Sequence, residues 1–275
     1  MNQAFEKVKL ARHPNRPTSK ILINEIFDDF LELHGDRLIG DDKSIIGGLA
    51  YLNNIPVTII AHEKGFRTNE KIYHNFGMPH PEGYHKALRL MKQAEKFNRP
   101  IITIIDTPGA YPGIGAEERG QANAIAVSIK EMMNLTVPII SLVLGEGGSG
   151  GALAIGIANK LVMFENSIYS VISPEGFASI LYKDSNKANI AAENMKLTAK
   201  DLLSFKIIDE IIDEKTPLNE DYKKSFLEFK NYLTKTLPKL MKLTKEELVL
   251  DRYKKYRNIG IYNEITKEKD NVEQI

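Results

Sequence analysis

Two glycine-rich segments contain the residues whose types and spacing are best suited to chemistry. The first is Asp106-Thr107-Pro108-Gly109-Ala110, and the second is Gly145-Glu146-Gly147-Gly148-Ser149-Gly150-Gly151. Glycines between a strand and a helix leave backbone N–H groups open to a ligand, and the start of the helix adds a partial positive charge. A loop of this kind stabilises an oxyanion that develops during a reaction. The purely structural alternative is that the glycines permit a tight turn and close packing of the helix on the sheet.

The second segment also matches the G-x-G-x-x-G pattern of dinucleotide-binding folds. Gly145, Gly147 and Gly150 follow a predicted strand and precede a predicted helix. Glu165 follows at about the spacing of the carboxylate that binds the ribose in those folds. Against this interpretation, the helix after the loop is short, and an earlier strand with its own glycine loop precedes the segment. A nicotinamide-dependent oxidoreductase stays open as an alternative.

Two other pattern matches do not hold. Gly147, Ser149 and Gly151 imitate the nucleophile elbow of α/β-hydrolases, but that fold needs a histidine after the serine, and the last histidine is His85. The segment Asp106-Thr107-Pro108-Gly109 resembles the D-x-x-G loop of GTPases, but the sequence lacks the G-x-x-x-x-G-K-[ST] phosphate-binding loop. We therefore expect neither a serine hydrolase nor a GTPase.

The two glycine segments have to be positioned by strands, because each follows a β-branched apolar run. These runs are 100–105 and 137–144, and each glycine loop leads into a predicted helix. Strands that alternate with helices indicate an α/β fold with a largely parallel sheet and right-handed crossovers. We expect both runs to be buried strands of that sheet.

The N-terminal part of the sequence predicts a helical lead-in, about residues 1–35, followed by a hairpin. The lead-in has apolar residues at helical spacing that end before Gly35: Ile21, Leu22, Ile26, Phe30 and Leu33. Segments 44–52 and 56–62 are predicted strands, joined by a turn at Asn53-Asn54. Residues 63–81 are predicted to form a long ordered loop.

The C-terminal part predicts two more strands and then mostly helix. The strands are 160–165 and 168–172, and a short apolar run follows at 207–212. Residues from about 218 to 275 are predicted to form a charged helical tail with few groups suited to chemistry. Because no linker rich in Gly, Ser or Pro divides the sequence, we expect residues 1–275 to form a single domain.

The composition excludes several classes of protein. The 275 residues have a formal charge of +1 and no cysteine, which excludes disulfides, thiolate catalysis, zinc ribbons and Fe–S clusters. The balanced charge argues against a nucleic-acid or membrane partner bound by bulk electrostatics. His62, His74, His80 and His85 do not have zinc-ligand spacing, so no metal site is expected. The N-terminus has no apolar signal segment, so we expect a cytoplasmic protein.

Longer strings around these motifs resemble a known family over about residues 10–212. They are Leu10-Ala11-Arg12-His13-Pro14, Asn75-Phe76-Gly77-Met78-Pro79, Pro81-Glu82-Gly83-Tyr84, Asp106-Thr107-Pro108-Gly109-Ala110-Tyr111-Pro112-Gly113, Gly115-Ala116-Glu117-Glu118-Arg119-Gly120-Gln121, the segment 145–154, and Tyr169-Ser170-Val171-Ile172-Ser173-Pro174-Glu175-Gly176. The sequence is similar to the α subunits of bacterial acetyl-CoA carboxylase carboxyltransferases.

The resemblance implies a crotonase-like fold of repeated β-β-α units with a helical C-terminal extension. It also implies the transfer of a carboxyl group from carboxybiotin, held on a carrier protein, to acetyl-CoA, which gives malonyl-CoA, the first committed step of fatty acid biosynthesis. Loss of CO₂ from carboxybiotin leaves an anionic ureido group that takes a proton from the acetyl methyl group, and the enolate then attacks CO₂. This chemistry needs oxyanion holes and a closed site, but no side-chain base.

The resemblance implies roles for two sets of residues. The biotin-side oxyanion hole is assigned to the N–H groups of Gly150 and Gly151, with Gly147 and Gly148 as the second choice. The neighbouring loop is expected to shape the substrate pocket through Asp106, Pro108, Gly109, Ala110 and Tyr111.

The resemblance also implies partners and cofactors. The thioester side of the site and a zinc ribbon belong to a β subunit, in an α₂β₂ assembly that is inactive without β. A biotin carboxyl carrier protein and a biotin carboxylase that consumes ATP complete the system. No nucleic acid or membrane partner and no covalently bound cofactor are expected. Longer family members have an additional N-terminal helical extension, and this sequence begins close to Leu10-Ala11-Arg12-His13-Pro14. A catalytically inactive crotonase-like scaffold is the second alternative.

Overall fold

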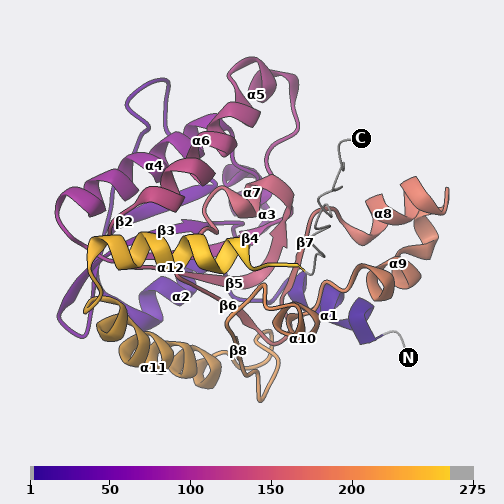
Figure 1. Ribbon diagram of the computed structural model, residues 1–275. Coiled ribbons are helices and arrows are strands. Elements are labelled where there is room, and N and C mark those ends of the chain that lie inside the picture. Colours follow the sequence, from indigo (N-terminus) through magenta and orange to yellow (C-terminus); the bar gives the residue numbers. More distant parts are fainter. Residues whose placement is uncertain (1–2, 261–275) are drawn as a thin grey trace, which may run out of the picture.

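The computed structural model describes residues 3–260 and contains a mixed β-sheet between layers of helices (Figure 1). The strands follow the order β1-β2-β3-β4-β5-β6-β8, and β7 pairs with the end of β5. Their bounds are β1 (Asp28–Glu32), β2 (Ile45–Leu52), β3 (Ile55–His62), β4 (Ile101–Thr107), β5 (Ile139–Gly148), β6 (Lys160–Phe164), β7 (Ile168–Ser170) and β8 (Glu210–Ile212).

Helices follow most strands and cover both faces of the sheet (Figure 1). They are α1 (Gln3–Ala11), α2 (Ser19–Ile26), α3 (Thr68–Tyr73), α4 (Pro81–Lys96), α5 (Ile114–Glu118), α6 (Gln121–Asn134), α7 (Ser149–Leu153), α8 (Pro174–Leu181), α9 (Ala188–Met195), α10 (Ala199–Ser204), α11 (Lys223–Leu240) and α12 (Lys245–Arg257), with 3-10 turns η1 (Asn75–Gly77) and η2 (Ser185–Lys187). None of the helices within residues 3–260 has the length and apolar character needed to cross a membrane.

The predicted largely parallel sheet is confirmed, with an antiparallel edge. From β3 onward the pairs β3–β4, β4–β5, β5–β6 and β6–β8 are parallel, whereas β1, β2 and β3 pair antiparallel. The hairpin turn is at Asn53 and Asn54, as predicted, and both have positive φ angles of 46° and 67°. Asparagine tolerates that conformation, which matches the twist of the two strands.

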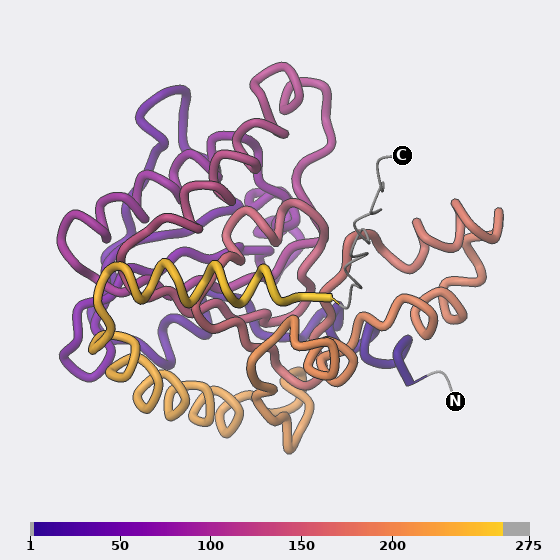
Figure 2. Tube along the Cα trace, viewed as in Figure 1, coloured from indigo at the N-terminus to yellow at the C-terminus, as the bar shows by residue number. Residues whose placement is uncertain are grey.

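The core consists of two apolar layers, one on each face of the sheet. Neighbouring residues of a strand point to opposite faces, so Ile104 packs with α2 and α11 while Ile105 packs with α4 and α6. Because β4 and β5 are buried on both faces, their sequences are continuous apolar runs rather than alternating ones. The helices α1, α8 and α9 project from the end of the sheet where β7 lies (Figure 2).

Three predictions for the N-terminal half and the glycine loop were partly wrong. Phe30 lies in strand β1, and Leu33 follows it, because Asp29 has a φ of 53° and the chain pairs with β2 instead of continuing the helix. The predicted loop 63–81 contains α3 and η1. The glycine segment is not a loop throughout, since β5 continues to Gly148 and only Ser149 leaves the strand.

The predicted helical tail is helical over its described part and forms one side of the core. Phe226, Phe229, Leu233 and Leu237 of α11 are buried against the sheet. On α12, Arg252 is fully buried, and its Nη1 donates to Asn159 Oδ1 at 2.7 Å and to the Val137 carbonyl at 3.3 Å. Residues 261–275 of the predicted tail lie outside the described residues.

Candidate functional site

The two glycine segments meet at the ends of β4 and β5, which are adjacent parallel strands. A Cβ atom on Gly148 would lie 2.2 Å from the Pro108 carbonyl oxygen. A Cβ atom on Gly151 would lie 2.7 Å from Ala110 N and 2.7 Å from Gly109 C. Both contacts are to backbone, so glycine is required at 148 and 151 by the close approach of the first loop.

The turn from β5 into α7 exposes backbone donors. Ser149 has a φ of 50°, and α7 begins at this residue with Gly148 as its N-cap. Within residues 3–260, the N–H groups of Gly150 and Gly151 donate to no acceptor. Gly150 is partly exposed, and a Cβ atom there would lie 3.4 Å from Ile125 Cδ1, an ordinary contact. Gly150 therefore offers an N–H group in a place with room for a ligand.

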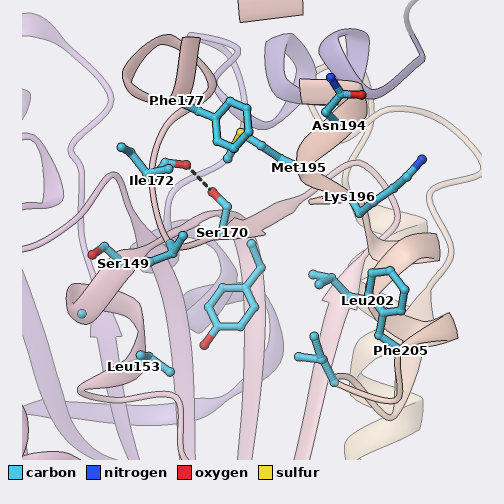
Figure 3. Close-up of a pocket in the computed structure, with 14 residues that line it drawn as sticks. Ser149, Leu153, Ser170, Ile172, Phe177, Asn194, Met195, Lys196, Leu202 and Phe205 are labelled. Carbon is cyan, nitrogen blue, oxygen red and sulfur yellow. Dashed lines mark hydrogen bonds between the residues drawn. The ribbon is translucent and has the colours of Figure 1, made fainter. Parts of the chain in front are cut away.

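An apolar cavity of about 550 Å³ adjoins this turn (Figure 3). Ser149 and Leu153 lie on one side of it, and Leu202 and Phe205 lie on the opposite side. Its other lining residues are Gly150, Tyr169, Ser170, Val171, Ile172, Phe177, Asn194, Met195, Lys196 and Ile207. A concave, mainly apolar cavity with a few convergent polar groups is the usual form of a small-molecule site.

The predicted glycines have different positions relative to this cavity. Gly150 is part of its wall, whereas Gly151 packs behind it on the first loop. Gly147 packs on the ring of Tyr169, since a Cβ atom there would lie 2.4 Å from Tyr169 Cδ2. Gly147 thus holds a cavity-lining ring in place, and Gly148 holds the first loop.

The predicted pocket residues of the first loop support the turn rather than line the cavity. Pro108, Gly109 and Ala110 contact the glycines of the second segment through their backbone. The Tyr111 ring instead stacks on His80, with ring centroids 4.3 Å apart. Asp106 lines a separate small cleft. None of these five residues is among those that line the apolar cavity.

Asp106 joins the two strands and neutralises a lysine. Its Oδ1 accepts from the Glu146 N–H at 2.9 Å and lies 2.7 Å from Lys64 Nζ. Lys64 Nζ also lies 3.8 Å from Glu146 Oε2. A substitution of Asp106 would leave the half-buried ammonium group of Lys64 and the buried Glu146 N–H without their main partner. The loss of this partner would lower the stability of the fold.

Arg12 connects the N-terminal helix to both sides of the site. Its Nη2 lies 2.6 Å from Glu146 Oε1, and its Nη1 lies 2.9 Å from Glu175 Oε1 at the start of α8. Burial lowers the pKa of the guanidinium group, but the hydrogen bonds and charges of Glu146 and Glu175 outweigh burial and raise it. Arg12 therefore stays charged and fixes α8, which lines the cavity, to the end of β5.

Sequence reasoning missed several of these residues. Arg12 and Glu175 stood inside strings used for the resemblance, but no local pattern pairs residues so far apart in the sequence. No chemical motif marked Tyr169 and Phe177, because their rings contribute apolar surface to the cavity rather than reactive groups. Lys64 lies outside those strings, and no local pattern pairs it with Asp106.

A buried histidine lies behind the turn. His62, at the end of β3, is fully buried, and burial lowers its pKa to about 3, with the charge of Lys64 acting in the same direction. Its interaction with the Gly151 backbone opposes the shift. The described residues contain no cluster of three or more His, Cys, Asp or Glu side chains that could hold a metal ion.

Comparisons with known proteins agree on one family. Residues 2–260 match the family described as acetyl co-enzyme A carboxylase carboxyltransferase-like. A Clostridium perfringens (strain ATCC 13124) protein named acetyl-coenzyme A carboxylase carboxyl transferase subunit alpha is 59% identical over 264 residues, which are 93% of this chain and 95% of the relative. The Staphylococcus epidermidis (strain RP62A) protein of the same name is 58% identical over 259 residues, 93% of this chain and 82% of the relative.

Solved structures show the same fold at low sequence identity. Transcarboxylase 12S is similar with a TM-score of 0.63 and 21% identity, over 82% of this chain and 44% of the other. The β subunit of geranyl-CoA carboxylase from P. aeruginosa gives 0.64 and 18%, over 84% of this chain and 44% of the other. The expected crotonase-like fold is thereby confirmed.

Proposed function

Because this chain belongs to the family of acetyl-CoA carboxylase carboxyltransferase α subunits, we propose that its glycine turn forms the biotin side of a carboxyl-transfer site. The family makes the chain a carboxyltransferase subunit, and the comparisons do not support a nicotinamide-dependent oxidoreductase or an inactive scaffold. One observation supports the site assignment above all others. The free N–H group of Gly150 belongs to the wall of the apolar cavity, next to the free N–H group of Gly151.

The substrates supply most of the reactivity: carboxybiotin releases CO₂ and leaves a negative charge on its ureido group, which then removes a proton from the methyl group of acetyl-CoA. The part of this chain is to stabilise that charge. The N–H groups of Gly150 and Gly151 donate to the ureido oxygen, and one such donor in a dry site is worth roughly 3–4 kcal/mol.

The cavity walls keep water out while the charge exists. Leu153, Tyr169, Phe177 and Phe205 present apolar surface around the glycine turn. A dry site strengthens the hydrogen bonds to the anion and retains CO₂ until the second substrate reacts. The backbone of Gly109 and Ala110, which contacts Gly151, keeps the two donors in position.

The rest of the reaction needs partners. We propose that residues 1–275 act as one domain, with a β subunit that supplies the thioester side and a zinc ribbon, in an α₂β₂ assembly. A biotin carboxyl carrier protein delivers the carboxyl group, and a separate biotin carboxylase consumes ATP to load it, in the cytoplasm. The product is malonyl-CoA for fatty acid synthesis. The partly exposed position of Gly150 in the cavity wall supports a site shared with the β subunit, because the second substrate has to reach the same place.

The test is the reverse half-reaction, malonyl-CoA decarboxylation dependent on free biocytin. It is measured with this chain alone, with a purified β subunit alone, and with the mixture. Turnover only in the mixture is expected. No turnover in a mixture that assembles by gel filtration would contradict the proposal and favour the scaffold. A titration with NADH tests the alternative function of a nicotinamide-dependent oxidoreductase, and we expect it to show no binding.

A further inference from the structure

The segment that follows α1 contacts the last residues of β5, directly before the glycine turn. Arg12 donates to the Glu146 carboxylate, and Arg16 donates to the Leu144 carbonyl. Between these two contacts, a Cβ atom on Gly145 would lie 3.0 Å from the carbonyl oxygen of the last residue of α1. Two arginines that are four residues apart therefore hold the end of β5 on both sides of Gly145.

Arg16 is a structural anchor of this segment. Its Nε and Nη2 donate to the Leu144 carbonyl at 2.9 and 2.7 Å, and Nη2 lies 2.7 Å from Glu214 Oε1. Both side chains are buried, and the Glu214 carboxylate also accepts from the N–H groups of Asn166 and Leu218. Removal of one partner from such a buried pair destabilises the whole fold. Arg16 thus fixes where the segment lies.

Arg12 is less buried and joins two carboxylates. Its Nε and Nη2 donate to Glu146 Oε1 at 3.0 and 2.6 Å, and its Nη1 donates to Glu175 Oε1 at 2.9 Å. About a third of its side chain, 30%, is exposed. A guanidinium group has five donors in a rigid fork, so it can bind two carboxylates at once, whereas a lysine ammonium group is a single point charge.

The contact with Glu146 leads to the proposed anion donors. Glu146 is held twice, because its carboxylate binds Arg12 and its N–H group donates to Asp106 Oδ1 at 2.9 Å. The strand continues only to Gly148 before the chain turns, and the free N–H group of Gly150 follows. The position of Glu146 therefore sets where the turn begins and where its donors point.

The contact with Glu175 leads to the wall that α8 contributes to the cavity. Glu175 lies in the first turn of α8, and Phe177, two residues further on, lines the cavity (Figure 3). The Ser173 hydroxyl accepts from the Gly176 N–H group at 3.0 Å and so caps this turn. Because the capped turn is a rigid unit, the contact with Glu175 also fixes the position of the Phe177 ring.

We propose that Arg12 is a positioning residue that serves both parts of the carboxyl-transfer site. Its contact with Glu146 aims the Gly150 and Gly151 N–H groups at the anion. Its contact with Glu175 holds the α8 wall of the cavity against the biotin group. Arg12 acts only through these two carboxylates, since it is not among the residues that line the cavity. This inference rests on the proposed function of the glycine turn.

The experiment compares three variants in the assembled complex with the β subunit. Arg12→Met removes both contacts and keeps a long side chain. Arg12→Lys keeps the charge but cannot hold two carboxylates in the same way, and Glu175→Gln removes the charge on the α8 wall alone. Each complex is assayed for biocytin-dependent malonyl-CoA decarboxylation, with kcat and the KM for each substrate, and for its thermal midpoint.

Two controls separate positioning from charge and from stability. Lys9→Met removes a cation from the same helix, where its partner Glu6 is exposed and lies 2.8 Å away. Leu233→Ala removes buried atoms from α11, on the opposite face of the sheet from the cavity. Lys9→Met should leave both the rate and the thermal midpoint unchanged. Leu233→Ala should lower the thermal midpoint and leave the rate of the folded complex unchanged.

We expect Arg12→Met to lower kcat about 10- to 100-fold, the cost of donors displaced by about 1 Å. Arg12→Lys and Glu175→Gln should keep kcat within a few-fold and raise the KM for biocytin about two- to fivefold, the worth of a partly exposed ion pair. The KM for malonyl-CoA should stay unchanged in all three variants, because the thioester binds on the β subunit.

Two results would overturn the inference. One is an Arg12→Met complex with the kcat of the wild type. The other is a loss of rate that follows the thermal midpoint equally in Arg12→Met and Leu233→Ala, which would show a role in stability alone. If Arg12→Met does not assemble, Arg12→Lys and Glu175→Gln decide: a raised KM for biocytin in both supports the inference, and an unchanged KM in both overturns it.

Failure of the proposed function gives a different result. In that case the wild-type complex itself has no biocytin-dependent turnover. An active wild-type complex that Gly150→Val inactivates and Arg12→Met does not would refute only the role of Arg12.

Discussion

Replacing Gly151 by alanine should inactivate the complex through a displacement that the structure allows us to size. The new Cβ atom would lie 2.7 Å from Ala110 N and Gly109 C, so the two segments would have to separate by about 0.7 Å to reach an ordinary contact of 3.4 Å. Both neighbours are backbone atoms and no side chain can rotate away. Overpacking of this kind costs roughly 1–3 kcal/mol of stability. Moving or losing one oxyanion donor lowers kcat by about 10²- to 10³-fold.

The assay is biocytin-dependent malonyl-CoA decarboxylation by the variant with the β subunit, after gel filtration shows that the complex forms. Gly150→Ala is the control, because its Cβ atom would meet only the Ile125 side chain at 3.4–3.5 Å. We expect Gly150→Ala to keep its rate within a few-fold. A Gly151→Ala complex with the full rate, or equal losses in both variants, would refute the reasoning that backbone contact behind the turn positions the donors.

Three further predictions concern the surroundings of the site. Asp106→Ala should lower the thermal midpoint and reduce kcat at least about tenfold, because it leaves the Glu146 N–H without an acceptor and Lys64 with only the longer ion pair to Glu146; a normal midpoint with a normal rate would contradict this. Arg252→Met should lower the free energy of unfolding in urea by about 1–3 kcal/mol, since it leaves the buried Val137 carbonyl without a donor and removes the charged one of the two donors to Asn159 Oδ1; a loss below about 0.5 kcal/mol would show that these oxygens find other partners. His62, with a pKa of about 3 when folded and an ordinary value of 6.5, binds a proton more readily in the unfolded state, so its contribution to stability is complete above pH 6.5 and falls as the pH drops toward 3. Urea unfolding between pH 6.5 and 4 should therefore show a weaker pH dependence in His62→Gln, and an unchanged dependence would contradict the low pKa.

The strands that position the site were predictable because their signals are local. The runs 100–105 and 137–144 are apolar throughout, as strands buried on both faces must be, and the glycine segments mark where each one ends. Parallel neighbours end at the same edge of a sheet, so the meeting of the two glycine segments follows from the topology.

The errors arose where distant partners outweigh local preference. Phe30 continues a helical spacing, but the chain leaves the helix at Phe27 and pairs with β2, where Leu31 lies opposite Leu49. The Tyr111 ring stacks on His80, a contact that no local pattern indicates. Such pairings depend on the register and twist of other elements.

The charged network of the site could not be predicted for the same reason. Arg12 and Glu146 are 134 residues apart, and nothing around either residue indicates the other. The role of Gly148 and Gly151 in close packing was open as the structural alternative to anion binding. The structure shows the packing directly, and the packing supports the binding hypothesis because it fixes the donors.

The burial of the sheet under α11 bears on how this chain is made. Until residues 223–240 have been synthesised, the face of the sheet that contains Ile102, Ile104 and Leu142 has α2 but not α11 to cover it. At about 5–20 residues per second, synthesis from residue 142 to residue 240 takes roughly 5–20 s, during which that apolar face is incompletely covered and can contact other chains. Overproduction should therefore favour aggregation of nascent chains, and slower synthesis at lower temperature should raise the yield of folded protein.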